Sequence, residues 1–125
     1  MKKAIKSEMA PKAIGPYNQA IECNGMVFVS GQLPLDLNSE MPQNVADQTT
    51  QVLKNLGYVL FEAGLSFDNV VKTTCYLTDM DDFAEMNKVY SSCFQNVPPA
   101  RATIAVRSLP LNALVEIECI AIRPS

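Results

Sequence analysis

Residues 114–122 read Leu-Val-Glu-Ile-Glu-Cys-Ile-Ala-Ile, and this stretch determines which folds the sequence can adopt. Successive side chains of a β-strand point to opposite faces of its sheet. One face of this strand would hold only small or apolar side chains, those of Val115, Ile117, Cys119 and Ala121. The opposite face would hold two carboxylates among apolar neighbours, namely Leu114, Glu116, Glu118, Ile120 and Ile122. We therefore expect helices to cover the first face, and the second face to need a different cover.

Three more segments are predicted to be strands. Residues 21–30 contain an Asn24-Gly25 pair between two apolar runs, which is the strongest short signal of a β-hairpin. Its second arm is apolar on both faces, and strands of that kind are covered on both sides. Residues 70–77 are rich in β-branched side chains, and residues 101–106 form the next predicted strand.

Two helices are predicted between these strands. Asn44 can cap the first, whose apolar residues recur at helical spacing up to Gly64, a natural C-cap. The second begins at or near Asp79 and is over before Pro98. The order predicts one α+β domain over residues 1–125, with both helices on one face of a mixed sheet. Two helices cannot cover both faces, so a second copy of the chain is expected to bury the other.

The composition excludes several classes of function. The 125 residues include no histidine, which excludes Ser-His and Cys-His catalytic sites and histidine-ligated metals. A net charge of -3 with only three arginines argues against a nucleic-acid-binding surface. Four cysteines form no Cys-x-x-Cys pair, which indicates free thiols in a reducing compartment. Because no apolar signal segment follows the opening Met-Lys-Lys, we expect a cytoplasmic protein.

Charged residues are predicted to meet on the face that the helices leave open. The apolar alternate residues Ala102, Ile104 and Val106 are expected to face the helices, which places Arg101 and Thr103 on the face of Glu116. A short connection predicts that the two strands are antiparallel neighbours, so that Arg101 and Glu116 reach one pocket. An arginine fork suits a substrate carboxylate, and a glutamate suits proton transfer or activation of water. The alternatives are a structural ion pair, or two solvent-exposed acids at 116 and 118.

Three other polar residues each have a structural and a functional interpretation. Asn87 borders the apolar stripe of the second helix and either satisfies a backbone group or reaches a pocket. Tyr17 follows the rigid Gly15-Pro16 pair and either packs against the chain or lines a pocket. Ser30 either caps a strand end or joins the site. The acidic residues at 79, 81 and 82 lack the glycine and terminal glutamate of a calcium loop, so they are interpreted as helix caps.

Three ordered motifs resemble the RidA family, also called YjgF/YER-type or reactive intermediate deaminases. They are Ile-Gly-Pro-Tyr at 14–17, Val-Ser-Gly-Gln-Leu-Pro at 29–34, and Pro-Ala-Arg at 99–101 followed by Val-Glu-Ile-Glu at 115–118. The similarity covers nearly the whole chain, from near residue 3 to near residue 123. The resemblance implies a chorismate-mutase-like α+β fold and a homotrimer whose sheets surround a central barrel, with sites at the subunit interfaces.

The resemblance also implies an activity, the hydrolysis of 2-imino and 2-enamino acids. The substrates are 2-aminoacrylate and 2-aminocrotonate, and the products are pyruvate or 2-oxobutyrate and ammonia. Arg101 would bind the substrate carboxylate, and Glu116 would position and activate water. Other pocket positions of the family match Tyr17, Ser30, Gly31 and Asn87. No cofactor is expected, because an imine is already electrophilic and needs neither a metal nor a nucleophilic triad.

The chain departs from many relatives at Thr103, where they carry cysteine, and at Ala102, where serine is common. We expect Thr103 to serve as a substrate-binding position through backbone contacts, because imine hydrolysis needs no covalent thiol intermediate. Two other functions stay open. One is a regulatory trimer that binds a small carboxylate without turning it over, and the other is a ribonuclease or translation inhibitor. The acidic composition and the absence of histidine argue against the second.

Overall fold

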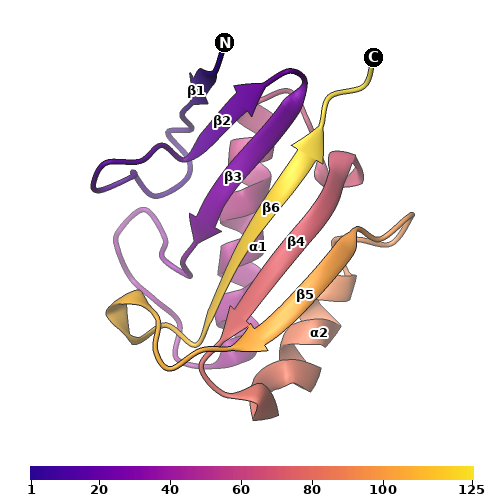
Figure 1. Cartoon of the computed structure of the whole chain (residues 1–125). Helices are drawn as coiled ribbons and strands as arrows, with labels where there is room; N and C mark the ends of the chain where they lie inside the picture. The colour runs from indigo at the N-terminus through magenta and orange to yellow at the C-terminus, as the bar shows by residue number, and fades with distance from the viewer.

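The computed structural model describes residues 1–125 and contains one six-stranded sheet with two helices behind it (Figure 1). The strands are β1 (Lys3–Ile5), β2 (Ala20–Cys23), β3 (Met26–Gln32), β4 (Val70–Leu77), β5 (Ala100–Ala105) and β6 (Val115–Ile122). The helices are α1 (Val45–Glu62) and α2 (Phe83–Ser91), with 3-10 turns η1 (Phe67–Asn69), η2 (Met80–Asp82) and η3 (Pro110–Asn112). The strand order is β1-β2-β3-β6-β4-β5, and only β4 and β5 pair in parallel. The predicted α+β class with one mixed sheet is confirmed.

The hairpin of β2 and β3 turns where the sequence predicts. Cys23 pairs with Met26, and the two residues between them, Asn24 and Gly25, have φ angles of 53° and 77°. Both angles are positive, as a type I′ turn requires, and Asn-Gly is the pair that adopts them most readily. Strand β1 was not predicted from the sequence. It pairs with β2 at the edge of the sheet, where lysine discourages pairing with another chain.

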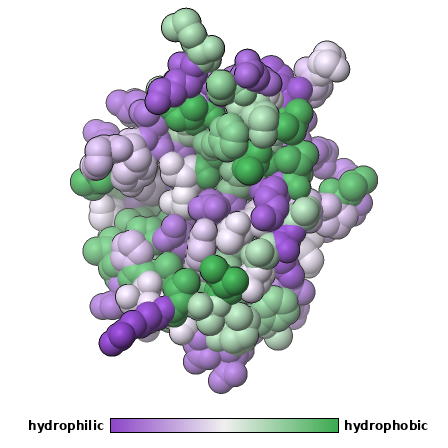
Figure 2. Space-filling model, in the orientation of Figure 1, coloured by the Kyte–Doolittle hydropathy of each residue, from purple (hydrophilic) through white to green (hydrophobic).

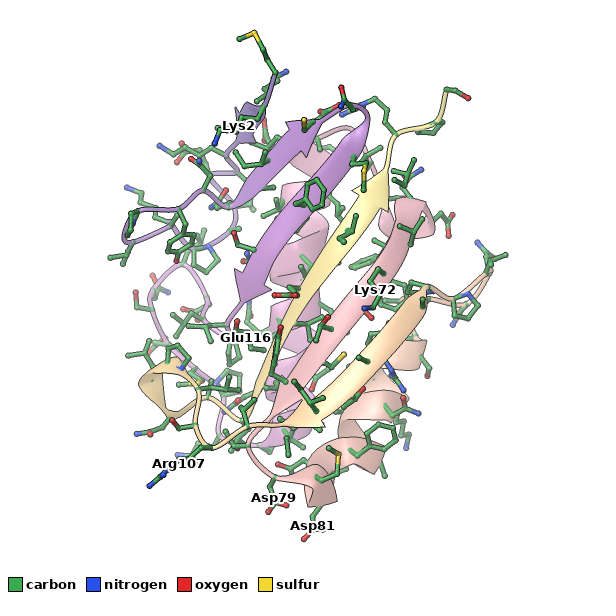
Figure 3. The ribbon with its side chains drawn as sticks, in the orientation of Figure 1. Lys2, Lys72, Asp79, Asp81, Arg107 and Glu116 are labelled. Atoms are coloured by element: carbon green, nitrogen blue, oxygen red, sulfur yellow. The ribbon has the colours of Figure 1, made fainter.

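A side chain caps α1 at the predicted position, and another caps the turn η2 that leads into α2. The Asn44 side chain accepts a hydrogen bond from the Asp47 amide at 2.8 Å, and Gly64 follows the C-cap with a φ of 75°. The Asp79 side chain accepts from the Asp81 amide at 2.9 Å where β4 leads through η2 into α2. Figure 3 shows Asp79 and Asp81 at that end of the molecule. The acidic cluster therefore caps a helical turn, as predicted.

Strand β6 lies in the middle of the sheet, between β3 and β4. Its inner face is packed under the helices, where Val115, Ile117, Cys119 and Ala121 are 4% exposed or less. The two-faced pattern of the quoted segment is thus confirmed. The predicted pairing of the two C-terminal strands is wrong, because β5 pairs with β4 at the sheet edge and never with β6. Helix α2 connects β4 to β5, which therefore runs parallel to β4. The chain then passes through η3 and enters the middle of the sheet as β6.

No helix lies over the other face of the sheet, which faces the viewer in Figure 1 and which we call the open face. It carries exposed apolar side chains on three strands, since Met26, Phe28, Ile104 and Ile122 are between 36% and 45% exposed. Figure 2 shows hydrophobic side chains gathered over the upper parts of β3 and β6, interrupted by polar groups. Contiguous exposed apolar surface of this kind marks an interaction surface. Neither α1 nor α2 has the length and apolar character that crossing a membrane requires.

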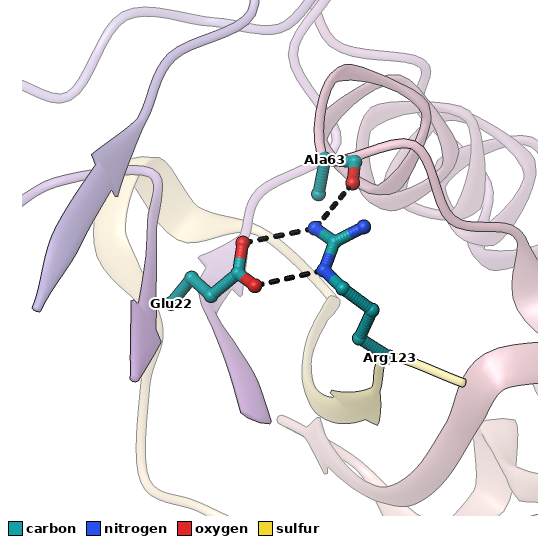
Figure 4. A network of polar contacts seen from close by, with 3 residues as sticks. All are labelled: Glu22, Ala63 and Arg123. Carbon is teal, nitrogen blue, oxygen red and sulfur yellow. Dashed lines mark hydrogen bonds and ion pairs between the residues drawn. The ribbon is translucent and has the colours of Figure 1, made fainter. Parts of the chain in front are cut away.

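One ion pair, together with a hydrogen bond, connects the C-terminal segment to the sheet and to the helix layer (Figure 4). The Arg123 guanidinium donates to both Glu22 carboxylate oxygens, at 2.8 and 2.9 Å, and to the Ala63 carbonyl oxygen at 2.6 Å. The Arg123 amide also donates to the Gly25 carbonyl oxygen at 2.7 Å. This network joins the hairpin, the end of α1 and the segment after β6. The Arg123 hydrogen bond lowers the pKa of Glu22, with desolvation opposing it.

Replacement of Glu22 by glutamine should lower the midpoint of thermal unfolding at pH 7. The folded-state pKa of Glu22 lies below 4.5, so its contribution to stability is present at higher pH and is lost as the pH falls through that folded value. Thermal unfolding of the wild type and of Glu22→Gln from pH 7 down to pH 3 measures this, and the two curves should converge in acid. A difference that stays constant over this range would show that the carboxylate charge plays no part.

Candidate functional site

The residues expected to form the site fall into two separate groups in one chain. The first group, which we call the open-face group, consists of Tyr17, Ser30, Gly31 and Glu116. The second group, which we call the edge group, consists of Asn87, Arg101 and Thr103 at the outer strand β5 and helix α2. The two groups lie on opposite faces of the sheet, so one chain does not bring Arg101 and Glu116 into a common pocket.

Arg101 lies on the helix side of β5. It stands in register with Thr73 of β4, whose side chain is fully buried beneath α2. Its Nη1 donates to the Asn87 side-chain oxygen at 2.7 Å. Its guanidinium carbon lies 4.7 Å from the ring centre of Tyr90 and 5.5 Å from that of Phe83. Both distances are within the range of a cation–π interaction.

The predicted orientation of β5 was therefore wrong. Ala102 and Ile104 point to the open face, and Arg101 and Thr103 point to the helix layer, while Val106 lies just past the strand end. The alternation of polar and apolar residues in this segment was recognised, but the face was assigned from the rule that apolar residues meet helices. At this edge the rule fails, because the apolar side chains of β5 lie on the open face. Aromatic rings of α2 instead pack against the Arg101 guanidinium.

The edge group leaves Arg101 without an anionic partner. The only ion pair in the chain joins Glu22 and Arg123, so the alternative of a structural Arg101–Glu116 pair within one chain is contradicted. Nη1 makes the only side-chain hydrogen bond of Arg101, and Nε and Nη2 make none. A partly buried guanidinium with a free Nε–Nη2 edge is suited to donate hydrogen bonds to both oxygens of a carboxylate.

Thr103 and Cys75 lie beside this arginine on neighbouring strands, in register with each other. The Thr103 hydroxyl oxygen is buried and has no hydrogen-bond partner. Burial raises the pKa of the Cys75 thiol to about 11, although Arg101 and the nearby threonine hydroxyls oppose the shift. Cys75 is therefore a neutral thiol at pH 7 and a poor nucleophile.

In the open-face group, Glu116 lies directly above Gly31. A Cβ on Gly31 would stand 2.9 Å from the Glu116 carboxyl carbon, which is closer than such atoms approach, so the carboxylate occupies space that only glycine leaves free. The pairing of β3 with β6 shifts between Val29 and Gln32, at this same place. Burial, followed by repulsion from Glu118, raises the pKa of Glu116. A raised carboxyl pKa is a common property of general acids and bases.

Ser30 and Tyr17 lie on the open face and line a hollow that Glu118, rather than Glu116, borders. The Ser30 hydroxyl donates to the Asn18 carbonyl oxygen at 2.6 Å, and its amide donates to Gln19 at 2.9 Å. These bonds hold the segment that carries Tyr17, whose side chain is 52% exposed. Tyr17 and Ser30 line an open hollow of about 530 Å³ on the open face, together with Phe28, Lys72, Glu118 and Ile120. Figure 3 shows Glu116 and Lys72 on the open face.

Sequence reasoning missed Phe83, Tyr90 and Lys72 as site residues. Phe83 and Tyr90 are seven residues apart on α2 and were interpreted as parts of its apolar stripe. That spacing places them on one helix face, but only the position of β5 shows that Arg101 covers them. The position of Lys72 in β4 is consistent with the open face, but a single lysine in a strand does not by itself indicate a pocket.

Comparison with known proteins gives these two groups a context. The family model described as "Endoribonuclease L-PSP" matches residues 7–123. The chain belongs to this family, which is also known as the YjgF/RidA family. The fold agrees throughout, since the crystal structure of E. coli TdcF with bound serine matches with a TM-score of 0.94 at 40% identity, over 98% of this chain and 99% of that one.

Several curated members of the family are similar to this chain over most of its length. "Reactive Intermediate Deaminase A, chloroplastic" of Arabidopsis thaliana is 48% identical over 96% of the chain, which spans 65% of that protein. The mouse protein named 2-iminobutanoate/2-iminopropanoate deaminase is 46% identical over 98% of this chain and 93% of its own length. Protein DfrA of Myxococcus xanthus is 50% identical over 97% and 95%.

Replacement of Glu116 by glutamine should not destabilise the protein at pH 7. The folded-state pKa of Glu116 is raised above 4.5, so its stabilising form is the protonated one, and that stability is lost as the pH rises through the folded value. Glu116→Gln removes this cost while keeping the shape of the side chain. Its unfolding midpoint should equal or exceed that of the wild type at pH 7, and the difference should vanish in acid. A clear loss of stability at pH 7 would instead mean that the carboxylate has a cationic partner.

Proposed function

We propose that this protein hydrolyses reactive 2-imino and 2-enamino acids to 2-oxo acids and ammonia, at sites formed between copies of the chain. The proposal rests on the separation, within one chain, of the arginine and the carboxylate that the reaction needs. An unpaired arginine lies at the outer edge of the sheet, and a carboxylate with a raised pKa lies on the open face. Each group supplies what the other lacks, because Arg101 can hold a substrate carboxylate and Glu116 can move a proton.

The open face supports an assembly in which the two groups meet. Its exposed apolar side chains extend across β3, β5 and β6, and β5 is the edge strand that carries Arg101. A second copy that packs on this face would bury the apolar surface and could bring its own β5 edge to Glu116. By resemblance to the family, we propose that three copies associate in this way around a central barrel.

The chemistry follows from the two side chains. Arg101 binds the substrate carboxylate through its free Nε–Nη2 edge and fixes the imine carbon near Glu116 of another copy. Glu116 takes a proton from water as the water oxygen bonds to the imine carbon, and the electron pair of the C=N bond moves to nitrogen. Glu116 returns the proton to this nitrogen, which gives a carbinolamine. Glu116 then carries a second proton from the carbinolamine hydroxyl to the nitrogen, so that the C–N bond breaks, ammonia leaves and the carbonyl of the 2-oxo acid forms. An enamine substrate first takes a proton at C3 and loses one from nitrogen, which gives the imine tautomer.

The names of relatives are consistent with this substrate class. The Arabidopsis and mouse proteins are named for deamination of reactive intermediates and of 2-imino acids. The TdcF crystal structure holds serine, which carries the same α-carboxylate as the proposed substrates. A cytoplasmic protein of this kind would remove imines before they modify other enzymes.

Two other functions predict different results. A regulatory carboxylate-binding protein would need Arg101 but not Glu116. A ribonuclease, which the family description suggests, would need a cationic surface, whereas the open face carries both Glu116 and Glu118 on β6. Hydrolysis of 2-aminoacrylate, generated in the assay by a serine dehydratase, separates the deaminase from both alternatives.

Inactive variants that lack different halves of the site should restore activity when they are mixed. The Arg101→Ala and Glu116→Gln variants are mixed in equal amounts, unfolded and refolded together. Some sites of the refolded oligomers then combine an intact Arg101 from one copy with an intact Glu116 from another. Random assembly of a cyclic oligomer gives about a quarter of the sites this composition. Deaminase activity of the mixture should therefore reach about a quarter of the wild-type value, while each variant alone falls by roughly 10²-fold or more.

The matched control is the double variant Arg101→Ala/Glu116→Gln, refolded with either single variant. These mixtures contain only one kind of intact residue, so no activity should return. Recovery in the control, or none in the test mixture despite subunit exchange, would contradict a shared site.

The assembly itself is tested by sedimentation equilibrium. The wild type should behave as three chains of 13.7 kDa each at micromolar concentration. Replacement of Phe28 by lysine on the apolar open face should shift it toward the monomer and abolish activity in parallel. A monodisperse wild-type monomer that retains full activity would rule out the shared site.

A further inference from the structure

The Arg101 guanidinium is held against α2 by three side chains of that helix. Asn87 accepts the Nη1 hydrogen bond, and the rings of Tyr90 and Phe83 lie 4.7 and 5.5 Å from the guanidinium carbon. The Nε and Nη2 atoms keep no partner within the chain. Asn87 and the two rings thus constrain one side of the group and leave its bidentate edge free.

Tyr90 is the most firmly fixed of these three residues. Its side chain is 6% exposed, and its hydroxyl lies 2.7 Å from the Thr73 hydroxyl, which is itself fully buried. The Tyr90 ring also packs against Phe94, with ring centres 4.5 Å apart. Thr73 stands in register with Arg101 on the adjacent strand, so one strand pair holds both the ring and the cation that covers it.

We propose that Tyr90, anchored by Thr73, is a positioning residue that sets the plane of the Arg101 guanidinium before substrate binds. This inference rests on the proposed function, since it assigns Arg101 as the carboxylate receptor. An arginine side chain free in solution must lose much rotamer entropy when it grips a carboxylate. The ring removes that freedom in advance, and the Asn87 bond selects which edge stays available.

The hydroxyl and the ring of Tyr90 have separable roles in this account. The hydroxyl anchors the residue to Thr73 and contributes to stability, because without it the Thr73 oxygen would be buried and unpaired. The ring orients Arg101 and contributes to substrate capture. Tyr90→Phe keeps the ring and loses the anchor, while Tyr90→Leu loses the ring and keeps apolar bulk.

The test measures thermal stability, affinity for 2-oxobutyrate by calorimetry, and the kcat and KM of imine hydrolysis. Tyr90→Phe should lower the unfolding midpoint and weaken affinity less than Tyr90→Leu does, and Thr73→Val in the same chain should recover part of the stability. Tyr90→Leu should weaken 2-oxobutyrate binding roughly 3- to 30-fold, with KM rising in proportion. Phe83→Leu, at the more exposed start of α2, provides a second ring deletion if Tyr90→Leu does not fold.

Arg101→Lys supplies the matched background. Lysine keeps the charge but has no planar fork for the ring to orient, so the loss caused by Tyr90→Leu should shrink to less than about threefold there. The same loss in both backgrounds, or unchanged affinity in folded ring-deletion variants, would overturn the positioning role. A wild type that binds 2-oxobutyrate but does not hydrolyse imines would overturn the proposed function, and the binding cycle would still decide the role of Tyr90. A wild type that does not bind 2-oxobutyrate would overturn both.

Discussion

The sheet has six strands but only two helices to cover it, and this imbalance governs the rest of the structure. Both helices pack on one face, where the central strand β6 buries Val115 and Ile117 completely. The opposite face keeps apolar side chains in contact with solvent and carries Glu116 and Glu118 among them. Burial of such a face is favourable, and this supports the proposed association between copies.

The same imbalance explains why a single chain holds two half-sites. The carboxylate of Glu116 is placed on the open face by the alternation of β6, and Gly31 on the adjacent strand leaves room for it. The guanidinium of Arg101 belongs to the edge strand and is turned toward α2, where Asn87 and Tyr90 hold it. Because the sheet separates the two groups, the proposed site is completed by a second copy that presents its edge to the open face. In the proposed assembly, stability and activity are linked, since burial of the apolar surface would also bring the two halves of the site together.

Local sequence signals predicted most of the elements. The Asn24-Gly25 turn, the Asn44 cap and the Asp79 cap are local, and all were found as expected. The alternation of β6 predicted its two faces, because one face of this strand is buried under the helices and the other is not. The edge strand β5 was placed wrongly, since its partner and its orientation depend on how α2 crosses the sheet, a long-range property that alternation does not encode. The roles of Tyr90 and Thr73 were not predicted, for the same reason. In the sequence each looks like an ordinary buried residue, and only the position of Arg101 on β5 indicates another role.

The central claim is that Arg101 of one copy and Glu116 of another act on the same molecule. A crystal structure of the protein with bound 2-oxobutyrate tests it most directly. The account predicts that the ligand carboxylate meets Nε and Nη2 of Arg101 while its C2 atom faces Glu116 of a neighbouring copy across the buried open face. A ligand held by Arg101 with no carboxylate of another copy near its C2 atom would contradict the claim, as would a ligand bound entirely within one chain.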